Sequence, residues 1–268
     1  TKVYREGIAI MLVVDRSGSM NARDFVQEDQ SIARLQVVQE VLKQFLGHGG
    51  DETGRPDDLV GLVTFARYAD SVAPLTLDHT NLAAILDQVS IVTDRNEDGT
   101  AVGEGLALAV ERLRRHKARS KVVILLTDGV SNTGDISPGQ AAELAAANDI
   151  KTYAVGAGRT GYAPFPVAWR GQTILRQAYV ELDERTLEDI AERTGGKYFH
   201  ADDSDTLAQV YEEIDALERS EIVEVRDMQY EEYYAAFALA CVVGITYVLL
   251  FRELKSKQLG FFAARLPS

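Results

Sequence analysis

The feature that most constrains the fold is a series of short apolar runs separated by amphipathic segments. Four runs, at residues 8–14, 59–65, 122–126 and 152–155, are apolar almost without interruption. Continuous rather than alternating apolarity is typical of strands that helices cover on both faces. The pattern therefore predicts a doubly wound α/β domain with a mostly parallel sheet.

The segments between the runs predict helices and one edge strand. Apolar residues recur at helical spacing in three sets: Ile32, Leu35, Val38, Leu42 and Phe45; Leu106, Val110 and Leu113; Leu207, Val210, Tyr211, Ile214 and Leu217. Residues 71–77 contain Pro74, which lacks an amide donor, so we predict an antiparallel edge strand there. Residues 156–181 hold several glycines, two prolines and the only tryptophan, and we expect an excursion between a strand and a helix. Tyr162 and Trp169 within it are either a contact patch or part of a locally folded loop.

Composition limits the class of protein. A chain of 268 residues with 46% hydrophobic residues is large enough for one substantial core. The formal net charge of -13 argues against binding to nucleic acids or anionic lipid surfaces, which requires clustered Lys and Arg. The single cysteine, Cys241, excludes an internal disulfide and a Cys-based zinc site.

The carboxyl-terminal part of the chain has the character of a membrane anchor. Residues 235–251 carry no charge, and Tyr230, Tyr233 and Tyr234 precede them, as aromatic residues do at a membrane interface. A buried core helix is the alternative interpretation. The predicted organisation is a globular domain at 1–219, a juxtamembrane linker at 220–232, a transmembrane helix at 233–252 and a tail at 253–268.

Charge predicts the orientation of this anchor. The tail after Phe251 is basic, whereas residues 220–234 are acidic. The positive-inside rule then places the carboxyl terminus in the cytoplasm and the α/β domain on the other side of the membrane.

Polar side chains cluster in sequence where the predicted strands end. Asp15, Ser17 and Ser19 follow the first run, Asp128 follows the run at 122–126, and Thr100 precedes a predicted helix. Functional sites of open α/β sheets form at the carboxyl ends of the strands, so these three loops are expected to meet. Hard oxygen donors without His or Cys favour Mg2+, Mn2+ or Ca2+ over zinc.

Simpler roles exist for each of these residues. Ser17 and Ser19 could cap the following helix, and Asp128 before Gly129 could form an ordinary turn. Gly18 would permit a tight turn between the serines. Asp98 and Glu104, which flank Thr100, are expected to act as neighbouring charges near a helix amino terminus and not as ligands.

Taken together, "DRSGSM", Thr100 in "DGTAVGEGL" and Asp128 in "LLTDG" resemble the metal-ion-dependent adhesion site (MIDAS) of von Willebrand factor type A (VWA) domains. The resemblance implies that Ser17, Ser19 and Thr100 bind the metal directly, and Asp15 and Asp128 directly or through water. A coordination position stays open, which a Glu or Asp of a partner protein would fill.

Longer stretches, including "EGIAIMLVVDRSGSMNARDF", "KVVILLTDGVSNTGDISPGQAAELA" and the final "ARLP", are similar to the Bat aerotolerance proteins of the BatA type. That similarity implies a protein of the bacterial inner membrane with a periplasmic VWA domain. It also implies partners, namely related membrane VWA proteins and a MoxR-type AAA+ ATPase, and a role in envelope stress or oxygen tolerance.

The expected function is metal-dependent protein binding without catalysis. An adhesion or matrix-binding protein using the same metal site is the alternative. A metal-dependent hydrolase is a weaker one, because no Lys follows Asp15 or Asp128 within its loop to hold a phosphate. "GAGRTG" at 156–161 matches a dinucleotide fingerprint, but Pro164 and Pro166 stand where the phosphate-binding helix should begin.

Overall fold

The computed structural model describes residues 7–26, 29–47, 57–118 and 120–227. Its elements are β1 (Ala9–Asp15), the 3-10 helix η1 (Gly18–Asn21), α1 (Arg34–Phe45), β2 (Leu59–Phe65), β3 (Ala69–Thr76), α2 (His79–Leu86), α3 (Val102–Arg114), β4 (Lys121–Thr127), α4 (Pro138–Ala146), β5 (Lys151–Ala157), β6 (Gly161–Trp169), β7 (Gln172–Val180), α5 (Glu184–Arg193), β8 (Tyr198–Ala201) and α6 (Ser204–Asp227). The chain divides into two compact units, residues 1–215 and 216–268. The first unit contains the sheet, and the described part of the second continues α6.

The central sheet has six strands in the order β3-β2-β1-β4-β5-β8. All neighbours pair in parallel except β3, which pairs with β2 in antiparallel fashion at the edge. The prediction of a mostly parallel sheet with one antiparallel edge strand is confirmed. Pro74 lies where the β2–β3 register shifts, a position at which the missing amide breaks no regular ladder.

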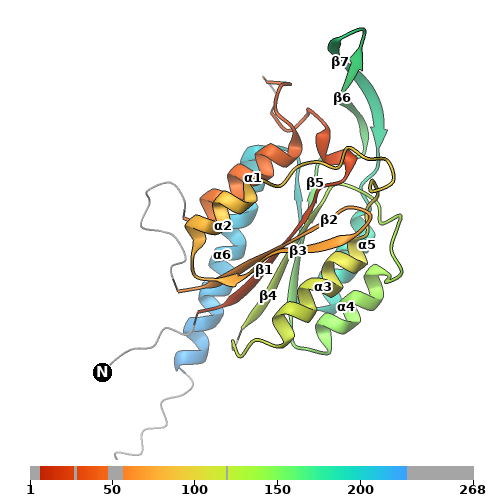
Figure 1. Ribbon diagram of the computed structural model, residues 1–268. Coiled ribbons are helices and arrows are strands. Elements are labelled where there is room, and N and C mark those ends of the chain that lie inside the picture. Colours follow the sequence, from red (N-terminus) through yellow and green to blue (C-terminus); the bar gives the residue numbers. More distant parts are fainter. Residues whose placement is uncertain (1–6, 27–28, 48–56, 119, 228–268) are drawn as a thin grey trace, which may run out of the picture. The chain divides into compact units, whose positions relative to one another are not determined.

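Helices cover both faces of this sheet, with α3, α4 and α5 on one face and α1 and α2 on the other (Figure 1). Every residue of β1 is buried, which explains why the strand is apolar from Ala9 to Val14. Burial of each such aliphatic side chain contributes about 1.5–3 kcal/mol. The two-sided cover leaves the carboxyl edge of the sheet as the place where polar loops emerge.

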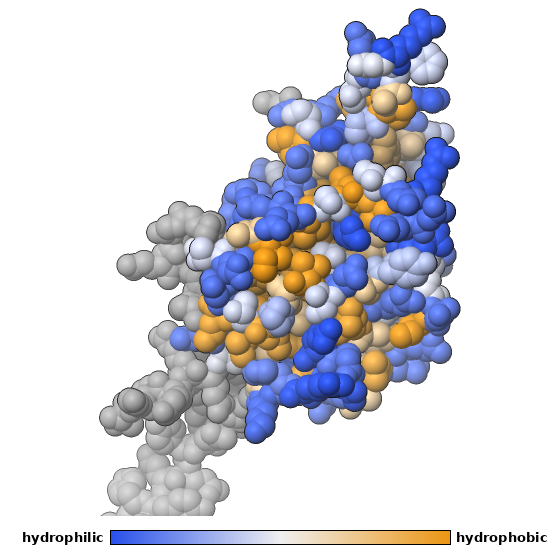
Figure 2. All heavy atoms as spheres, viewed as in Figure 1, coloured by the Kyte–Doolittle hydropathy of each residue, from blue (hydrophilic) through white to orange (hydrophobic). Residues whose placement is uncertain are grey.

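Residues 156–181 differ from the expected irregular excursion, because most of them form the hairpin of β6 and β7, which projects beyond the sheet (Figure 1). Its surface carries both polar and apolar side chains (Figure 2), among them the exposed Tyr162 and Tyr179. Prolines suggested a loop because they cannot donate to a ladder, but a two-stranded ribbon has open outer edges where this loss costs little. One backbone hydrogen bond ties the hairpin to the domain, from Arg23 N to Pro164 O at 2.9 Å.

The hairpin turn requires left-handed backbone at both of its residues. Trp169 pairs with Gln172, and Arg170 and Gly171 between them have φ of 49° and 81°. Two positive φ angles define a type I′ turn, whose twist matches that of the strands.

Gly171→Ala is therefore expected to destabilise the hairpin by about 1 kcal/mol, because an L side chain is strained at this φ. Amide hydrogen exchange of residues 161–180 should become faster. Gly139→Ala is the matched control. Gly139 lies in α4 with nothing within 4 Å of an added Cβ, so alanine should stabilise that helix. Unchanged exchange in the Gly171 variant would contradict the assignment of the turn.

The predicted transmembrane helix at 233–252 lies outside the described residues and stays a prediction. Within residues 7–227, as far as they are described, no helix is long and apolar enough to cross a membrane.

Candidate metal site

The site begins where two adjacent parallel strands end. β1 ends at Asp15 and its neighbour β4 at Thr127, and the two strands run in register. Thr127 Oγ1 donates to Asp15 Oδ2 at 2.6 Å, and Ser17 N donates to Asp15 Oδ1 at 2.8 Å. Asp15 is fully buried, so both of its oxygens are held in fixed positions at the carboxyl edge.

Ser17 and Ser19 link this first loop to the loop after β4. The two serine Oγ atoms lie 2.8 Å apart, and Ser19 Oγ donates to Asp128 Oδ1 at 2.5 Å. Ser17 stands at the N-cap of η1, but its side chain makes no capping hydrogen bond. The capping role considered from sequence therefore does not account for Ser17.

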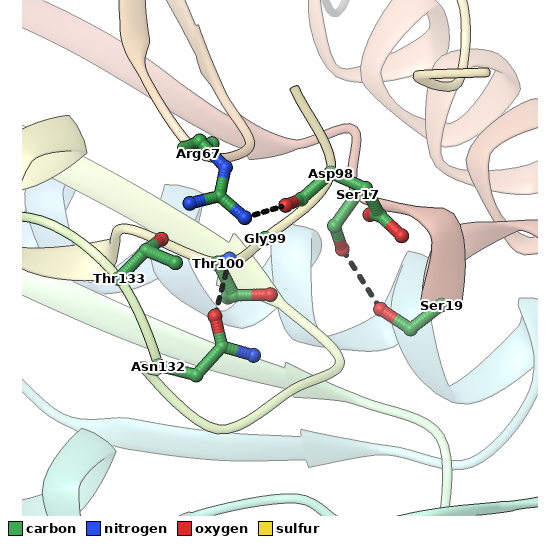
Figure 3. A pocket seen from close by; sticks show the side chains of 8 residues that line it. All are labelled: Ser17, Ser19, Arg67, Asp98, Gly99, Thr100, Asn132 and Thr133. Carbon is green, nitrogen blue, oxygen red and sulfur yellow. Dashed lines mark hydrogen bonds between the residues drawn. The ribbon is translucent and has the colours of Figure 1, made fainter. Parts of the chain in front are cut away.

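Thr100 brings the third loop to the same place. Its Oγ1 lies 3.5 Å, and Ser19 Oγ 3.8 Å, from the position that a Cβ on Gly129 would occupy. Figure 3 shows the Thr100 hydroxyl pointing toward the two serine hydroxyls. Thr100 N donates to Asn132 Oδ1 at 3.0 Å, which fixes the loop. All five residues singled out from sequence thus gather at one point.

The hydroxyls and the carboxylates of the site lie at different depths below the surface. Ser17, Ser19 and Thr100 line an open pocket of about 470 Å³. Asp15 and Asp128 do not line it and are 0% and 2% exposed. The three hydroxyls therefore line the opening together with the charged Asp98 and Arg67, and the carboxylates of Asp15 and Asp128 lie behind them.

Arg34 is a functional residue that the sequence analysis missed. Its Nη1 donates to Asp128 Oδ2 at 2.8 Å, and its Nε donates to Asp24 Oδ1 at 2.7 Å. The Arg34 side chain is only 1% exposed. A signal existed, because Arg34 shares the buried face of α1 with Val37, Val38 and Val41, where a cation needs a partner.

Asp98 approaches the first loop more closely than sequence suggested. Its Oδ1 accepts a hydrogen bond from Gly18 N at 2.9 Å, and a Cβ on Gly18 would lie 2.9 Å from Asp98 Oδ2. Gly18 lies in the tight turn that we expected, at the start of η1, where Met20 N donates to Ser17 O at 3.1 Å, and a larger residue there would displace the Asp98 carboxylate. Glu104 lies in the first turn of α3 and accepts from Asp135 N at 3.0 Å.

Burial makes the charges of the two carboxylates costly. Desolvation, and after it the neighbouring Asp128 carboxylate, raises the pKa of Asp15 to about 7. Desolvation also raises the pKa of Asp128, although Arg34 and the hydrogen bond from Ser19 oppose it. Burial alone would lower the pKa of Arg34, but Asp24 and Asp128 outweigh that effect and raise it. Arg34 thus neutralises the pair Asp15 and Asp128 only in part.

Comparison with known families shows the family of this chain. A family model described as von Willebrand factor type A domain matches residues 9–213. The chain belongs to the VWA domain family. The match includes every residue of the site.

Two bacterial proteins are among the relatives of this VWA protein. An uncharacterized protein of Borreliella burgdorferi is 28% identical over 254 residues, which are 92% of this chain and 71% of that protein. A UPF0353 protein of Mycolicibacterium paratuberculosis is 31% identical over 216 residues, covering 75% of this chain and 58% of the relative. The chain thus spans less than two thirds of the second relative.

This VWA domain is similar to solved structures of bacterial proteins, one of them an aerotolerance-related membrane protein. One from Bacteroides fragilis aligns with a TM-score of 0.60 and 25% identity, over 77% of this chain and 98% of that chain. BatB from Bacteroides thetaiotaomicron has the same fold, with a TM-score of 0.63 and 23% identity over 80% of this chain and 100% of that one. The relationship to these proteins is shown, whereas the narrower BatA assignment is not confirmed.

VWA domains with a MIDAS motif bind divalent metals. Proximal thread matrix protein 1 from the mussel byssus, solved with zinc in its MIDAS motif, shares the fold with a TM-score of 0.56 and 23% identity over 78% of this chain and 44% of that one.

The donor set of this VWA domain fits a hard divalent cation. The described residues contain no group of three His, Cys, Asp or Glu side chains placed to hold a metal, so a site built mainly from carboxylates is not present there. Three hydroxyls and two carboxylates are instead an all-oxygen set suited to Mg2+. The raised pKa values of both carboxylates indicate a place where added positive charge is stabilising.

This electrostatic situation predicts a pH dependence. Asp15 has a pKa of about 7 in the fold against an ordinary 3.8, so its protonation stabilises the metal-free protein. That contribution is full below pH 3.8 and is lost as the pH rises through the folded value. Because a cation must displace this proton, Mg2+ affinity should fall about ten-fold for each pH unit below 7. Calorimetry from pH 5.5 to 8.5 measures it, and a flat profile would contradict a role for Asp15.

Proposed function

We propose that this VWA domain binds a divalent cation, Mg2+ in the first instance, and through it a partner protein. The residues that would hold the cation are Asp15, Ser17, Ser19, Thr100 and Asp128. The observation that carries the proposal is that hydroxyls from two loops line the pocket in front of two buried carboxylates. Mn2+ or Ca2+ could take the same donors.

The arrangement of charge supports protein binding without catalysis. A bound cation supplies positive charge that two carboxylates neutralise only in part, since Arg34 already shares Asp128. A Glu or Asp side chain of a partner is a suitable further ligand for such a cation. No described histidine lines the pocket to act as a base there.

Relatives support a setting for this binding. The similar protein from Bacteroides fragilis is an aerotolerance-related membrane protein. In this chain, residues 233–252 have the composition of a membrane span. We therefore place the chain in the bacterial inner membrane, with the VWA domain periplasmic and the carboxyl terminus cytoplasmic. Its proposed partners are other Bat-type VWA proteins and a MoxR-type AAA+ ATPase, as in a BatA-type complex.

The partner interaction is tested by co-purification of the full chain from detergent-solubilised membranes, with Mg2+ or with a chelator. Membrane VWA proteins that are retained only with Mg2+, and lost in a Ser19→Ala variant, would support the proposal. An extracellular ligand retained in the same way would favour adhesion instead. Mg2+-dependent turnover of a phosphate ester that disappears in the variant would favour a hydrolase.

Orientation is tested separately with a reporter fused after Ser268. A reporter that is active in the cytoplasm agrees with the proposed topology, and activity in the periplasm would reverse it.

A further inference from the structure

Arg67 is the one cationic residue among those that line the pocket (Figure 3). It follows β2 at the carboxyl edge of the sheet, and its Nη2 donates to the backbone oxygen of Asp98 at 3.0 Å. Within the described part of the chain Arg67 makes no ion pair with a carboxylate, and its buried Nε has no hydrogen-bond partner. A buried guanidinium N–H without a hydrogen-bond partner destabilises the fold unless a ligand accepts its hydrogen bond.

A second unused polar atom lies in the same pocket. Thr133 Oγ1 is buried and has no hydrogen-bond partner among the described residues. A Cβ on Gly99 would lie 3.0 Å from Thr133 Oγ1 and 3.5 Å from Arg67 Cα, so both residues approach Gly99, and both line the pocket. Two polar groups without partners in the lining of one pocket, one of them on a guanidinium, point to an anionic ligand there.

We propose that Arg67 and Thr133 form an anion subsite that binds the second carboxylate oxygen of the partner's Glu or Asp. The first oxygen of that carboxylate would face the cation held near Ser17, Ser19 and Thr100, so the inference rests on the proposed function. A guanidinium suits this role because an N–H of a charged group makes a stronger hydrogen bond to a carboxylate oxygen than a neutral donor does. The pocket volume of about 470 Å³ leaves room for a side chain beside a cation.

An arginine in an anion subsite affects Mg2+ affinity and carboxylate affinity in opposite directions, which an arginine with only a structural role would not do. A guanidinium beside a divalent cation repels it when no anion lies between them, and attracts the anion that arrives. Arg67→Gln should therefore raise Mg2+ affinity about two-fold while lowering the affinity for a carboxylate about ten-fold. The two effects have opposite signs.

The experiment uses the full chain in detergent, with Mg2+ binding measured by calorimetry. The carboxylate probe is a labelled peptide whose single glutamate is its only charged side chain, and its binding is measured by fluorescence anisotropy at saturating Mg2+. The same peptide with glutamine in place of glutamate serves as the blank. The variants are Arg67→Gln, Arg67→Lys and Thr133→Val. Arg95→Gln is the matched control, because Arg95 is exposed and lies outside the pocket lining.

The expected result is weaker peptide binding with equal or tighter Mg2+ binding in Arg67→Gln, partial recovery in Arg67→Lys, and a smaller loss in Thr133→Val. Arg95→Gln should behave like the unaltered chain. Equal peptide affinity in Arg67→Gln, or a parallel loss of Mg2+ and peptide, would overturn the subsite while leaving the proposed function intact. A chain that binds neither Mg2+ nor the glutamate peptide would instead refute the proposed function.

Discussion

Replacement of Arg34 by methionine is expected to lower the free energy of unfolding of the metal-free protein by about 3–5 kcal/mol. Arg34 is the only described cation that contacts the buried Asp128 carboxylate, at 2.8 Å. Methionine fills much of the same volume but leaves Asp128 buried without a countercharge, which is the costly way to break a buried ion pair. Urea denaturation in the presence of a chelator measures the effect.

A second variant separates charge from packing. Arg34→Met combined with Asp128→Asn removes both charges, so it should recover a large part of the lost stability. The loss in Arg34→Met alone should also be larger at pH 8 than at pH 5, because Asp128 can take up a proton at the lower pH and burial favours its neutral form. Equal stability of Arg34→Met and the unaltered chain at pH 8 would show that the buried pair is not needed.

Asp15→Asn is expected to reduce Mg2+ affinity about 100-fold or more, because it removes one of the two carboxylates among the five proposed ligands. The same change should stabilise the metal-free protein above pH 7, since an amide carries no charge in the buried position where the pKa of Asp15 is raised. The amide oxygen can still accept from Ser17 N, and the Thr127 hydroxyl can turn to accept from the amide nitrogen. Calorimetry and thermal unfolding with and without Mg2+ test both effects.

The control for this change is Asp135→Asn, at an exposed position. It should leave Mg2+ affinity and stability within error of the unaltered chain. Unchanged Mg2+ affinity in Asp15→Asn would remove the proposed site. Lower stability of that variant without metal would show that the hydrogen bonds of Asp15 outweigh its desolvation.

The strands of the sheet were predictable because their signal is local. A strand that helices cover on both faces is apolar along nearly its whole length, as β1 is from Ala9 to Val14, and that requirement is visible in a few consecutive residues. Pro74 marked the edge strand for a similarly local reason. The hairpin of β6 and β7 was missed because prolines normally oppose strands, and only the ribbon's open edges make them tolerable.

The site was predictable to the level of its loops. The carboxyl ends of parallel strands meet at one edge of the sheet. The sequence therefore predicted that one site would contain Asp15, Ser17, Ser19, Thr100 and Asp128. Which of them face the opening and which lie buried beneath it could not, because depth depends on how the loops pack.

The sequence by itself thus determined the layered α/β fold, the edge where its polar loops meet and the oxygen chemistry of the candidate metal site. Only the tertiary structure decided which cation contacts Asp128 and which polar groups in the pocket lining are left without partners. Arg34 and Asp128 are 94 residues apart in the chain, and Arg67 and Thr133 come together around Gly99. No local pattern encodes such pairs, because each side chain is satisfied, or left unsatisfied, only when distant loops close around it.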